Sequence, residues 1–562
     1  MGVLLCVTLQ SCAQTERQEY LGNWVGNLPD KNAFNFQVTL KNLGKDQYQI
    51  SIENDKPILD RTVKSTQKGR LSFNIDNALF LNFKNHRDSL SGYIQSGAFY
   101  YYVTLKKVAP DTFLGDWNAF MVNNGLQSNE LFLNIEWYNN QLEAYPFLGD
   151  QRFRGFYANN YKMEGKTLLF KDSNTGFNFR ATLLEDKVEF EIYIIDSLVT
   201  QATLYAYKDY WEPPLPPVVD NKNAFSPKDL NDGWSIGNII DFNIDYTELR
   251  KLIDSINSKA LVNTHSVLIS KNKKLVFEAY FDGFNAQIPH DLRSASKSIS
   301  SAIIGIAVDD GIIESVDEKL YNFIPREYQY TKDSLKSKIK LKHLLTMSSG
   351  LDVNNEAQED NYQNAGNPNS WLKTVLEAPM VKEPGTYADY GSANPFLLGV
   401  CLNEKLKEPL ETYMDERLFS PLGITNYINQ TDDTRKRPYF GGGMLLTPRD
   451  LLKFGQLYLN RGQWNGKQII SENWVEESMG TYLRLQDYPD KNEYGYLWWH
   501  DTYTINGKAF ESIEARGAGG QFIFIVPELE AVCVITAGNF RNGKSDQSRE
   551  IFRNYIIPSM VE

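Results

Sequence analysis

Short runs in which apolar and polar residues alternate fill the chain between residues 19 and 208. Examples are Phe34-Asn-Phe-Gln-Val-Thr-Leu40, Tyr48-Gln-Ile-Ser-Ile52 and Val188-Glu-Phe-Glu-Ile-Tyr-Ile194, and clusters of Asn, Asp, Gly and Lys separate such runs. A period of two is typical of strands with one buried face, and many short strands between turns indicate an antiparallel barrel or sandwich. The first part of the chain is therefore predicted to be all-β.

This β-rich part contains a near-repeat. Tyr20-Leu-Gly-Asn-Trp24 and Phe113-Leu-Gly-Asp-Trp117 are almost the same pentad, and alternating runs follow each copy. Repetition of this kind indicates two copies of one structural unit. We expect two small β-domains, residues 19–108 and 109–208.

A proline-rich segment follows the second repeat. Four of five consecutive residues are proline at the end of Tyr210-Trp-Glu-Pro-Pro-Leu-Pro-Pro217. Proline lacks the backbone N–H that a helix needs, so such a segment favours a stiff, extended connector. Residues 209–224 are predicted to be a linker.

The pattern changes to mixed α and β from about residue 225. Apolar strand-like runs at 267–270 and 274–280, and again at 521–526 and 531–536, are each separated by a short turn and predict two hairpins. Helical stretches lie between them, for example near residues 300–310 and 448–459. Strands at both ends with helices between them predict an α+β domain over residues 225–562, an antiparallel sheet with helices packed on it.

Charge and composition exclude several kinds of partner. The chain has 58 Lys and Arg against 70 Asp and Glu, a formal net charge of −12. Nucleic-acid binding relies on basic patches, so nucleic acid is not an expected partner. The five histidines show no metal-ligand spacing, so we expect no metal and no cofactor. Cys401 and Cys533 lie in apolar runs and are expected to be buried free thiols.

The first residues are apolar from Val3 to Leu9 and reach Cys12 after Leu9-Gln-Ser11. This pattern is similar to the end of a bacterial lipoprotein signal, in which the cysteine carries the lipid. We expect residues 1–18 to be a signal and tether, with lipidation at Cys12. The protein would then lie in the bacterial cell envelope, periplasmic or membrane-anchored, and contact the membrane only through this lipid. A frayed apolar N-terminus is the alternative.

Ser-x-x-Lys tetrads offer candidate nucleophiles, because on a helix the amine lies one turn from the hydroxyl and can take its proton. The chain contains five such tetrads, starting at Ser65, Ser270, Ser294, Ser337 and Ser370. Only Ser294 opens onto a nearly uncharged run, residues 298–308, which predicts a buried central helix. We therefore single out Ser294 and Lys297. The alternative is that Ser294 caps the helix and Lys297 is solvated.

Five segments in order resemble motifs of the serine β-lactamases and penicillin-binding proteins. They are Leu292-Arg-Ser-Ala-Ser-Lys-Ser298, Ile339-Lys-Leu-Lys-His-Leu-Leu-Thr-Met-Ser-Ser-Gly-Leu351, Pro384-Gly-Thr-Tyr-Ala-Asp-Tyr-Gly-Ser392 before Leu397-Leu-Gly399, Gly441-Gly-Gly-Met-Leu-Leu-Thr-Pro-Arg-Asp450 and Ala515-Arg-Gly-Ala-Gly-Gly-Gln521. The resemblance is to the class C-like branch, which includes esterases, D-aminopeptidases and 6-aminohexanoate-dimer hydrolases. It implies a β-lactamase-like fold over residues 225–562 and an acyl-enzyme on Ser294.

The family's second motif is Tyr-x-Asn before Leu-Leu-Gly, and by position its tyrosine is Tyr390, with Tyr387 as the rival. Ser392 stands where the family has asparagine. A phenol becomes a useful base when a nearby positive charge stabilises its anion, and Lys297 would supply that charge. Serine lacks the amide of asparagine, which puts lactamase-type contacts to a substrate carbonyl in doubt.

The third motif is Lys-Thr-Gly or His-x-Gly in many relatives, and Ala515-Arg516-Gly517 stands in its place without a Lys or His. That basic residue commonly meets a substrate carboxylate. Arg516 is a candidate to attract an anion, or it points to solvent. The resemblance implies an oxyanion hole from the backbone N–H groups of Ser294 and Ala518. Gly517 and the glycines after Ala518 would let the backbone approach the substrate.

The sequence thus predicts a serine hydrolase that cleaves a small ester, amide or peptide through Ser294, with Lys297 and Tyr390 as bases. Its expected partner is a small-molecule or peptide substrate. A β-lactamase or D,D-peptidase acting on cell-wall-like substrates is the alternative within the same chemistry. A non-catalytic envelope binding or sensor protein is the alternative from another class.

Overall fold

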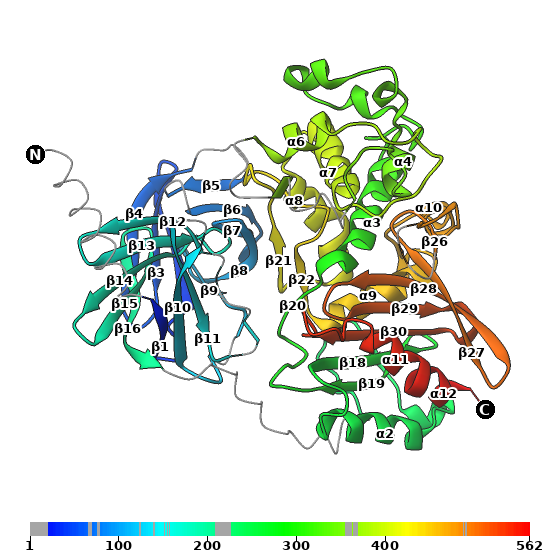
Figure 1. Ribbon diagram of the computed structural model, residues 1–562, viewed down its shortest axis with the longest axis horizontal. Helices are drawn as coiled ribbons and strands as arrows, with labels where there is room; N and C mark the ends of the chain where they lie inside the picture. The colour runs from blue at the N-terminus through cyan, green and yellow to red at the C-terminus, as the bar shows by residue number, and fades with distance from the viewer. Residues whose placement is uncertain are drawn as a thin grey trace, which may run out of the picture. The chain divides into compact units, whose positions relative to one another are not determined.

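The computed structural model divides the chain into two compact units, Met1–Pro216 and Pro217–Glu562 (Figure 1). The structure describes residues 21–65, 70–75, 79–122, 125–138, 141–150, 152–153, 156, 158–207, 226–354, 362–363, 369–486, 488 and 492–561. The predicted α+β architecture is confirmed, because an all-β region precedes a domain in which helices pack on an antiparallel sheet.

Two antiparallel sheets form the first unit. One runs in the order β5 (Leu71–Asn74), β6 (Leu79–Asn85), β7 (Ser89–Ser96), β8 (Phe99–Ala109), β9 (Thr112–Asn118), β2 (Asn35–Gly44), β3 (Gln47–Glu53) and β4 (Pro57–Lys64). The other runs in the order β11 (Gln141–Leu148), β10 (Glu130–Tyr138), β1 (Gly22–Asn27), β16 (Ser197–Tyr207), β15 (Lys187–Ile194), β14 (Asn178–Leu184), β13 (Thr167–Asp172) and β12 (Ala158–Glu164).

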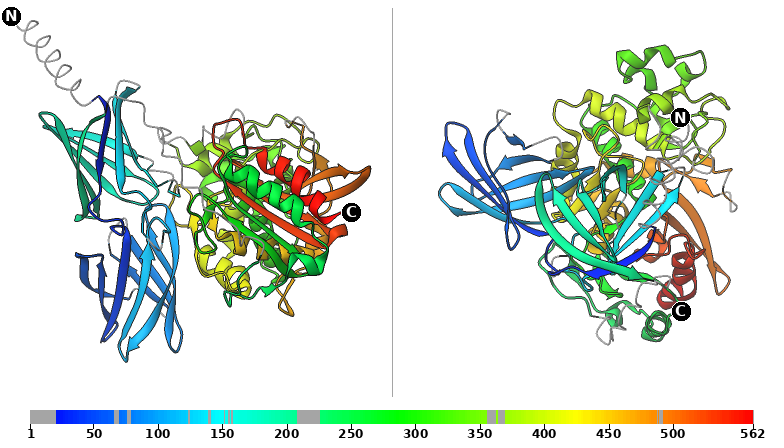
Figure 2. Two further views of the ribbon diagram at one scale, coloured as in Figure 1. Left: turned by 90° about the horizontal axis from the view of Figure 1, so that it is seen from below. Right: turned by 60° about the vertical axis from the view of Figure 1, so that its left-hand side comes forward.

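The alternating runs form strands with one buried face, as predicted. In β15, Val188, Phe190, Ile192 and Ile194 are buried, whereas the residues between them are half-buried. The edge strands of the second sheet meet, because the Tyr161 hydroxyl on β12 donates to a backbone carbonyl of β11 at 3.2 Å. This sheet therefore curls toward a barrel (Figure 2).

The two repeats exchange their first strands. β1, which carries Trp24, pairs with β10 and β16 and lies inside the second sheet. β9, which carries Trp117, pairs with β2 and β8 and lies inside the first. Both tryptophans are buried. Each sheet therefore contains a strand from the other half of the repeat.

A nine-stranded sheet forms the framework of the second unit. Its order is β17 (Ser235–Ile236), β19 (Lys274–Tyr280), β18 (Thr264–Lys271), β30 (Ala531–Ala537), β29 (Gln521–Val526), β28 (Lys508–Gly517), β27 (Trp499–Ile505), β26 (Glu493–Tyr494) and β25 (Leu483–Arg484). All neighbours are antiparallel except β17 and β19. The predicted hairpins are β18–β19 and β29–β30. A short ladder of β20 (His290–Asp291), β22 (Met444–Leu446) and β21 (Tyr427–Gln430) lies apart from this sheet.

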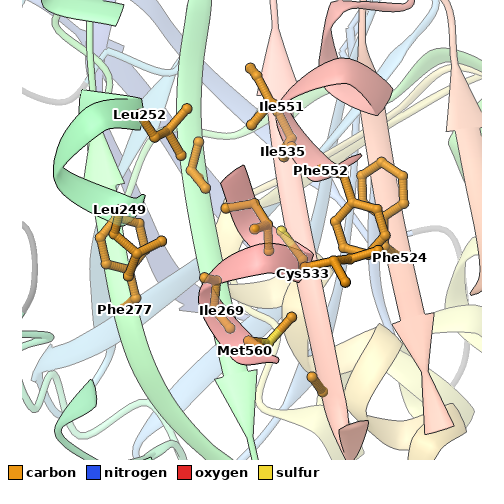
Figure 3. Close-up of a cluster of buried hydrophobic side chains, with 14 of the residues drawn as sticks. Leu249, Leu252, Ile269, Phe277, Phe524, Cys533, Ile535, Ile551, Phe552 and Met560 are labelled. Atoms are coloured by element: carbon orange, nitrogen blue, oxygen red, sulfur yellow. The ribbon is translucent and has the colours of Figure 1, made fainter. Parts of the chain in front are cut away.

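Helices cover both faces of this sheet. The helices described in this unit are α2 (Tyr246–Asn257), α3 (Ser296–Asp309), α4 (Leu341–Leu345), α6 (Trp371–Glu377), α7 (Ala393–Lys405), α8 (Leu410–Met414), α9 (Pro448–Leu459), α10 (Glu472–Ser478), α11 (Gln547–Ile551) and α12 (Ile557–Met560). On one face, α2 and the C-terminal helices enclose a core that includes Leu249, Phe277, Phe524, Cys533 and Phe552 (Figure 3). Helix α9 packs on the other face, where Gly455 lies against Ile523 and Val532.

The predicted buried helix after Ser294 is confirmed. Every residue of α3 from Ser296 to Ala307 is buried. Gly305 lies directly against the Trp474 ring, since a Cβ atom there would be 2.3 Å from it. Cys401 and Cys533 are buried free thiols, as expected. In the described part of the chain, no helix combines the length and the apolar character needed to cross a membrane.

Candidate active site

Ser294 and Lys297 lie within hydrogen-bonding distance at the start of the central helix. Ser294 belongs to a 3-10 turn, η2 (Arg293–Ala295), which leads directly into α3. The Lys297 Nζ donates to the Ser294 Oγ at 2.7 Å and to the backbone carbonyl of Gly441 at 2.6 Å. Lys297 is 1% exposed, whereas Ser294 is partly accessible. A proton can pass between the two side chains while the hydroxyl still meets a substrate.

The turn that carries Ser294 is held in an uncommon backbone conformation. Arg293 has a φ of 48°, in the left-handed region. Such a residue costs on the order of 1–3 kcal/mol unless its surroundings hold it. Here the Asp291 carboxylate accepts from the Arg293 backbone N–H at 3.0 Å, and the Ser296 hydroxyl donates to the Arg293 carbonyl at 2.7 Å. These contacts fix the backbone immediately before the candidate nucleophile.

Gly441 supplies the second acceptor for Lys297. A Cβ atom at Gly441 would lie 2.3 Å from the Tyr439 Oη and 2.7 Å from the Ser392 carbonyl oxygen, so no larger residue fits without movement. The triple glycine was predicted only as a family landmark. The role of the Gly441 carbonyl was missed because a backbone acceptor has no signature in the side chains.

Tyr390, the predicted second base, lies beside Lys297. The Lys297 Nζ is 5.2 Å from the centroid of the Tyr390 ring, and Tyr390 is 3% exposed. Its ring contacts Trp499 at a centroid distance of 5.2 Å and Tyr488 at 5.5 Å. The rival Tyr387 instead lies under the ammonium of Lys382. The structure therefore brings Tyr390 together with the Ser294–Lys297 pair.

Ser392 is the residue before α7 and is buried. Its backbone carbonyl accepts from the Phe396 N–H at 3.2 Å and adjoins Gly441. Ser392 therefore lies close to the second acceptor of Lys297, at the edge of the same small group of residues.

The turn between β28 and β29 contacts the turn that carries Ser294. A Cβ atom at Gly517 would lie 2.2 Å from the Leu292 carbonyl oxygen and 3.1 Å from the Ala295 nitrogen. Gly519 and Gly520 have φ values of 82° and 96°, which L residues rarely adopt. Ala518, between Gly517 and Gly519, is exposed. The two segments expected to supply the oxyanion hole are therefore in direct contact.

The third motif lies at the open end of β28. The β27–β28 ladder ends at the pair Trp499 and Glu514, so the last three residues of β28 extend beyond it. Ala515 is fully buried. Arg516 forms ion pairs with Glu514 and Asp501. This guanidinium, a candidate anion receptor in the sequence, thus has two carboxylate partners of its own.

Two of the histidines form a contact that the sequence did not predict, although it is not a metal site. In the described ranges, no group of three His, Cys, Asp or Glu residues could hold a metal ion. His265 and His290 are nevertheless hydrogen-bonded, with 2.8 Å between Nδ1 of the first and Nε2 of the second, and both are buried. Sequence spacing missed this pair because β18 and β20 bring together residues far apart in the chain. Cys12, the predicted lipidation site, lies outside the described residues.

Comparison with known proteins assigns the family. The family model described as Beta-lactamase matches residues 249–555, more than half of the chain. The chain therefore belongs to the Beta-lactamase family, and the predicted resemblance to serine β-lactamases and penicillin-binding proteins is confirmed. Its fold is that of the serine β-lactamase type of hydrolase.

Individual relatives are distant. The chain is 22% identical over 295 residues to the 6-aminohexanoate-dimer hydrolase of Paenarthrobacter ureafaciens, covering 48% of this chain and 71% of that protein. It is 22% identical over 319 residues to Beta-lactamase-like protein 4 of Dictyostelium discoideum, covering 53% of this chain and 50% of that protein. The solved penicillin binding protein from Bacillus halodurans is 16% identical, with a TM-score of 0.41, and covers 52% of this chain and 97% of that one.

Proposed function

We propose that this protein is a serine hydrolase that cleaves a small ester, amide or short peptide through an acyl-enzyme on Ser294. The observation that carries this proposal is the 2.7 Å contact between the Ser294 hydroxyl and the buried Lys297 amine. A buried amine beside an accessible hydroxyl is the arrangement that activates a serine nucleophile. Tyr390, whose ring centroid lies 5.2 Å from the same amine, is the second group through which the proton can move.

The proposed reaction has two steps. In the first, the Ser294 Oγ gives its proton to the Lys297–Tyr390 pair and attacks the substrate carbonyl carbon. The backbone N–H groups of Ser294 and Ala518 would stabilise the oxyanion, the bond to the leaving group breaks, and the leaving group takes up the proton. In the second, water attacks the acyl-enzyme while Tyr390 accepts its proton, and Ser294 regains a proton as the acid leaves.

Three features favour a linear ester or amide over a β-lactam as the substrate. Ala515 stands where a basic residue would meet a carboxylate and is fully buried. Arg516 is already paired with two carboxylates. The first relative is named for hydrolysis of the 6-aminohexanoate dimer, which makes linear amides a sensible class to assay.

Hydrolysis of p-nitrophenyl esters, linear amides, D-amino acid peptides and a chromogenic cephalosporin, assayed side by side, tests the proposal. We expect ester or amide turnover that falls by at least about a thousandfold in Ser294→Ala. Rapid cephalosporin turnover would favour the β-lactamase alternative. Absence of turnover with every substrate would favour a binding or sensor protein.

We also propose that a lipid at Cys12 keeps the enzyme at the cell envelope. The apolar run that ends at this cysteine supports the proposal. Metabolic labelling with an alkyne fatty acid should mark the protein, and Cys12→Ser should abolish the label. Labelling that persists in Cys12→Ser would contradict lipidation at this residue.

A further inference from the structure

Arg516 has a partner at every nitrogen of its guanidinium. Nε donates to the Glu514 carboxylate at 2.7 Å, Nη2 donates to the Asp501 carboxylate at 3.0 Å, and Nη1 donates to the Asn492 side-chain oxygen at 3.2 Å. The Arg516 side chain is only 11% exposed. The rigid fork of an arginine suits such a set of fixed acceptors.

The Glu514 carboxylate depends on Arg516 for its positive partner. The Glu514 side chain is completely buried, and burial raises the pKa of its carboxyl while the neighbouring Arg516 opposes that rise. The Tyr503 hydroxyl also donates to Glu514, and Arg549 pairs with Asp501. If the guanidinium turned toward a substrate anion, Glu514 would be left as a buried charge without its cation, which is strongly unfavourable.

The Arg516 guanidinium also stacks on Trp499, whose ring packs on the candidate catalytic residue Tyr390. The Arg516 Cζ lies 4.8 Å from the centroid of the Trp499 ring. Trp499 is 4% exposed and packs on Tyr390, whose ring lies beside the Lys297 Nζ. Planar guanidinium groups stack well on tryptophan, and this contact strengthens when both groups are desolvated.

We propose that Arg516 is a positioning residue that fixes Trp499 against Tyr390, and that it does not bind a substrate carboxylate. This inference rests on the proposed serine hydrolase function. The carboxylates of Glu514 and Asp501 fix the Arg516 guanidinium, which in turn fixes the Trp499 ring. The Trp499 ring then keeps the Tyr390 ring beside Lys297. Arg516 therefore affects the rate of proton transfer at Tyr390 equally for charged and uncharged substrates.

Two matched esters distinguish positioning from anion binding. p-Nitrophenyl valerate and mono-p-nitrophenyl glutarate differ in a terminal carboxylate, and both report release of the same phenol. Arg516→Lys keeps the charge but removes the planar fork, and Trp499→Phe keeps a ring against Tyr390 but weakens the stack. These two variants, the double variant and Lys508→Gln, a control at the exposed far end of β28, are assayed with both esters.

We expect kcat to fall by about tenfold or more in each single variant for both esters, with KM changed by less than about threefold. The double variant should be little worse than either single one, because both act through one contact. A rise in KM for the glutarate alone in Arg516→Lys, additive losses, or unchanged kcat would overturn the proposal. If Arg516→Lys does not fold, Trp499→Phe alone decides, since unchanged kcat there would equally overturn it.

Failure of the proposed function is recognised before any variant is made. It would appear as wild-type protein that neither turns over the two esters nor accepts a fluorophosphonate at Ser294. Wild-type turnover with unaffected variants would leave the hydrolase proposal standing and remove only the role of Arg516.

Discussion

The Lys297 amine is hydrogen-bonded at the same time to the hydroxyl of Ser294 and to the backbone carbonyl of Gly441. The second bond holds the amine by a contact outside the helix turn that joins it to Ser294. The position of the base thus depends on a loop more than a hundred residues further along the chain. Replacing Lys297 and replacing Gly441 should therefore each impair the enzyme.

Replacement of Lys297 should remove catalysis. Lys297→Met keeps an unbranched apolar side chain, one atom shorter, but has no group that takes the serine proton. We expect kcat/KM for an ester to fall by about a hundredfold to ten-thousandfold. Lys336→Met is a matched control, because Lys336 is also buried and donates to a backbone carbonyl at 2.7 Å. It should cost about 1–2 kcal/mol of stability and leave kcat/KM unchanged. Equal losses in both variants would contradict a specific role for Lys297.

Gly441→Ala should impair the enzyme without touching a catalytic side chain. The added methyl group would lie 2.3 Å from the Tyr439 Oη, so the loop must shift and carry its carbonyl away from Lys297. We expect at least a tenfold loss of kcat, roughly the value of one lost hydrogen bond to a charged group. Gly442→Ala is the control, because its nearest contact at 3.6 Å is ordinary packing. Activity in Gly441→Ala equal to that in Gly442→Ala would exclude this role.

The strand exchange predicts that neither half of the first unit folds alone. A fragment of residues 109–216 lacks β1, which sits between β10 and β16. A fragment of residues 21–108 likewise lacks β9, which sits between β8 and β2. Circular dichroism and gel filtration should show unfolded or aggregated fragments that regain structure when mixed. Cooperative unfolding of an isolated fragment would contradict the exchange.

Local pattern was enough to predict the strands but not this exchange. The alternation in β15 fixes which side chains are buried, since that depends only on residues two apart. Nothing in the pentads of Trp24 and Trp117 says which copy of the repeat each strand joins. That choice is made by packing between residues far apart in sequence, as in the pairing of Trp24 with Leu133.

The same limit applies to the candidate site: its chemically active side chains were predicted from the sequence, but contacts that depend on the fold were not. Ser294, Lys297 and Tyr390 have side chains that carry the chemistry, and their order along the chain resembles a family motif. The role of the Gly441 carbonyl and the stack of Arg516 on Trp499 could not be predicted in this way. The first is a backbone group, and the second is a contact between two side chains that only the fold brings together. The buried pair of His265 and His290 is a third example.

Acid should destabilise the protein through His343. Burial, together with the nearby Lys342 and Lys340, lowers the pKa of His343 from its usual 6.5 to about 4. Between these values the unfolded chain binds a proton that the folded chain does not, so the free energy of unfolding decreases as pH falls from about 6.5 to 4. Because His343 is only partly buried, we expect about 1–2 kcal/mol over this range.

A comparison with His343→Asn isolates that contribution. The His343 Nδ1 accepts from the Lys340 backbone N–H at 3.2 Å, and the Asn side-chain oxygen can replace this acceptor without titrating. Burial also lowers the pKa of His500, so other groups add to the acid sensitivity of both proteins. Urea denaturation at several pH values should show a smaller loss of stability in the variant. Parallel curves for the two proteins would contradict the assignment.

Covalent labelling of Ser294 is the most direct test of the central claim. A fluorophosphonate is added to the wild type, to Ser294→Ala and to Ser337→Ala, which removes the serine of another Ser-x-x-Lys tetrad. Intact mass and peptide mapping should show one adduct, on Ser294, in the wild type and in Ser337→Ala, and none in Ser294→Ala. An adduct that persists in Ser294→Ala, or a folded wild-type protein that takes up no probe, would contradict Ser294 as the nucleophile.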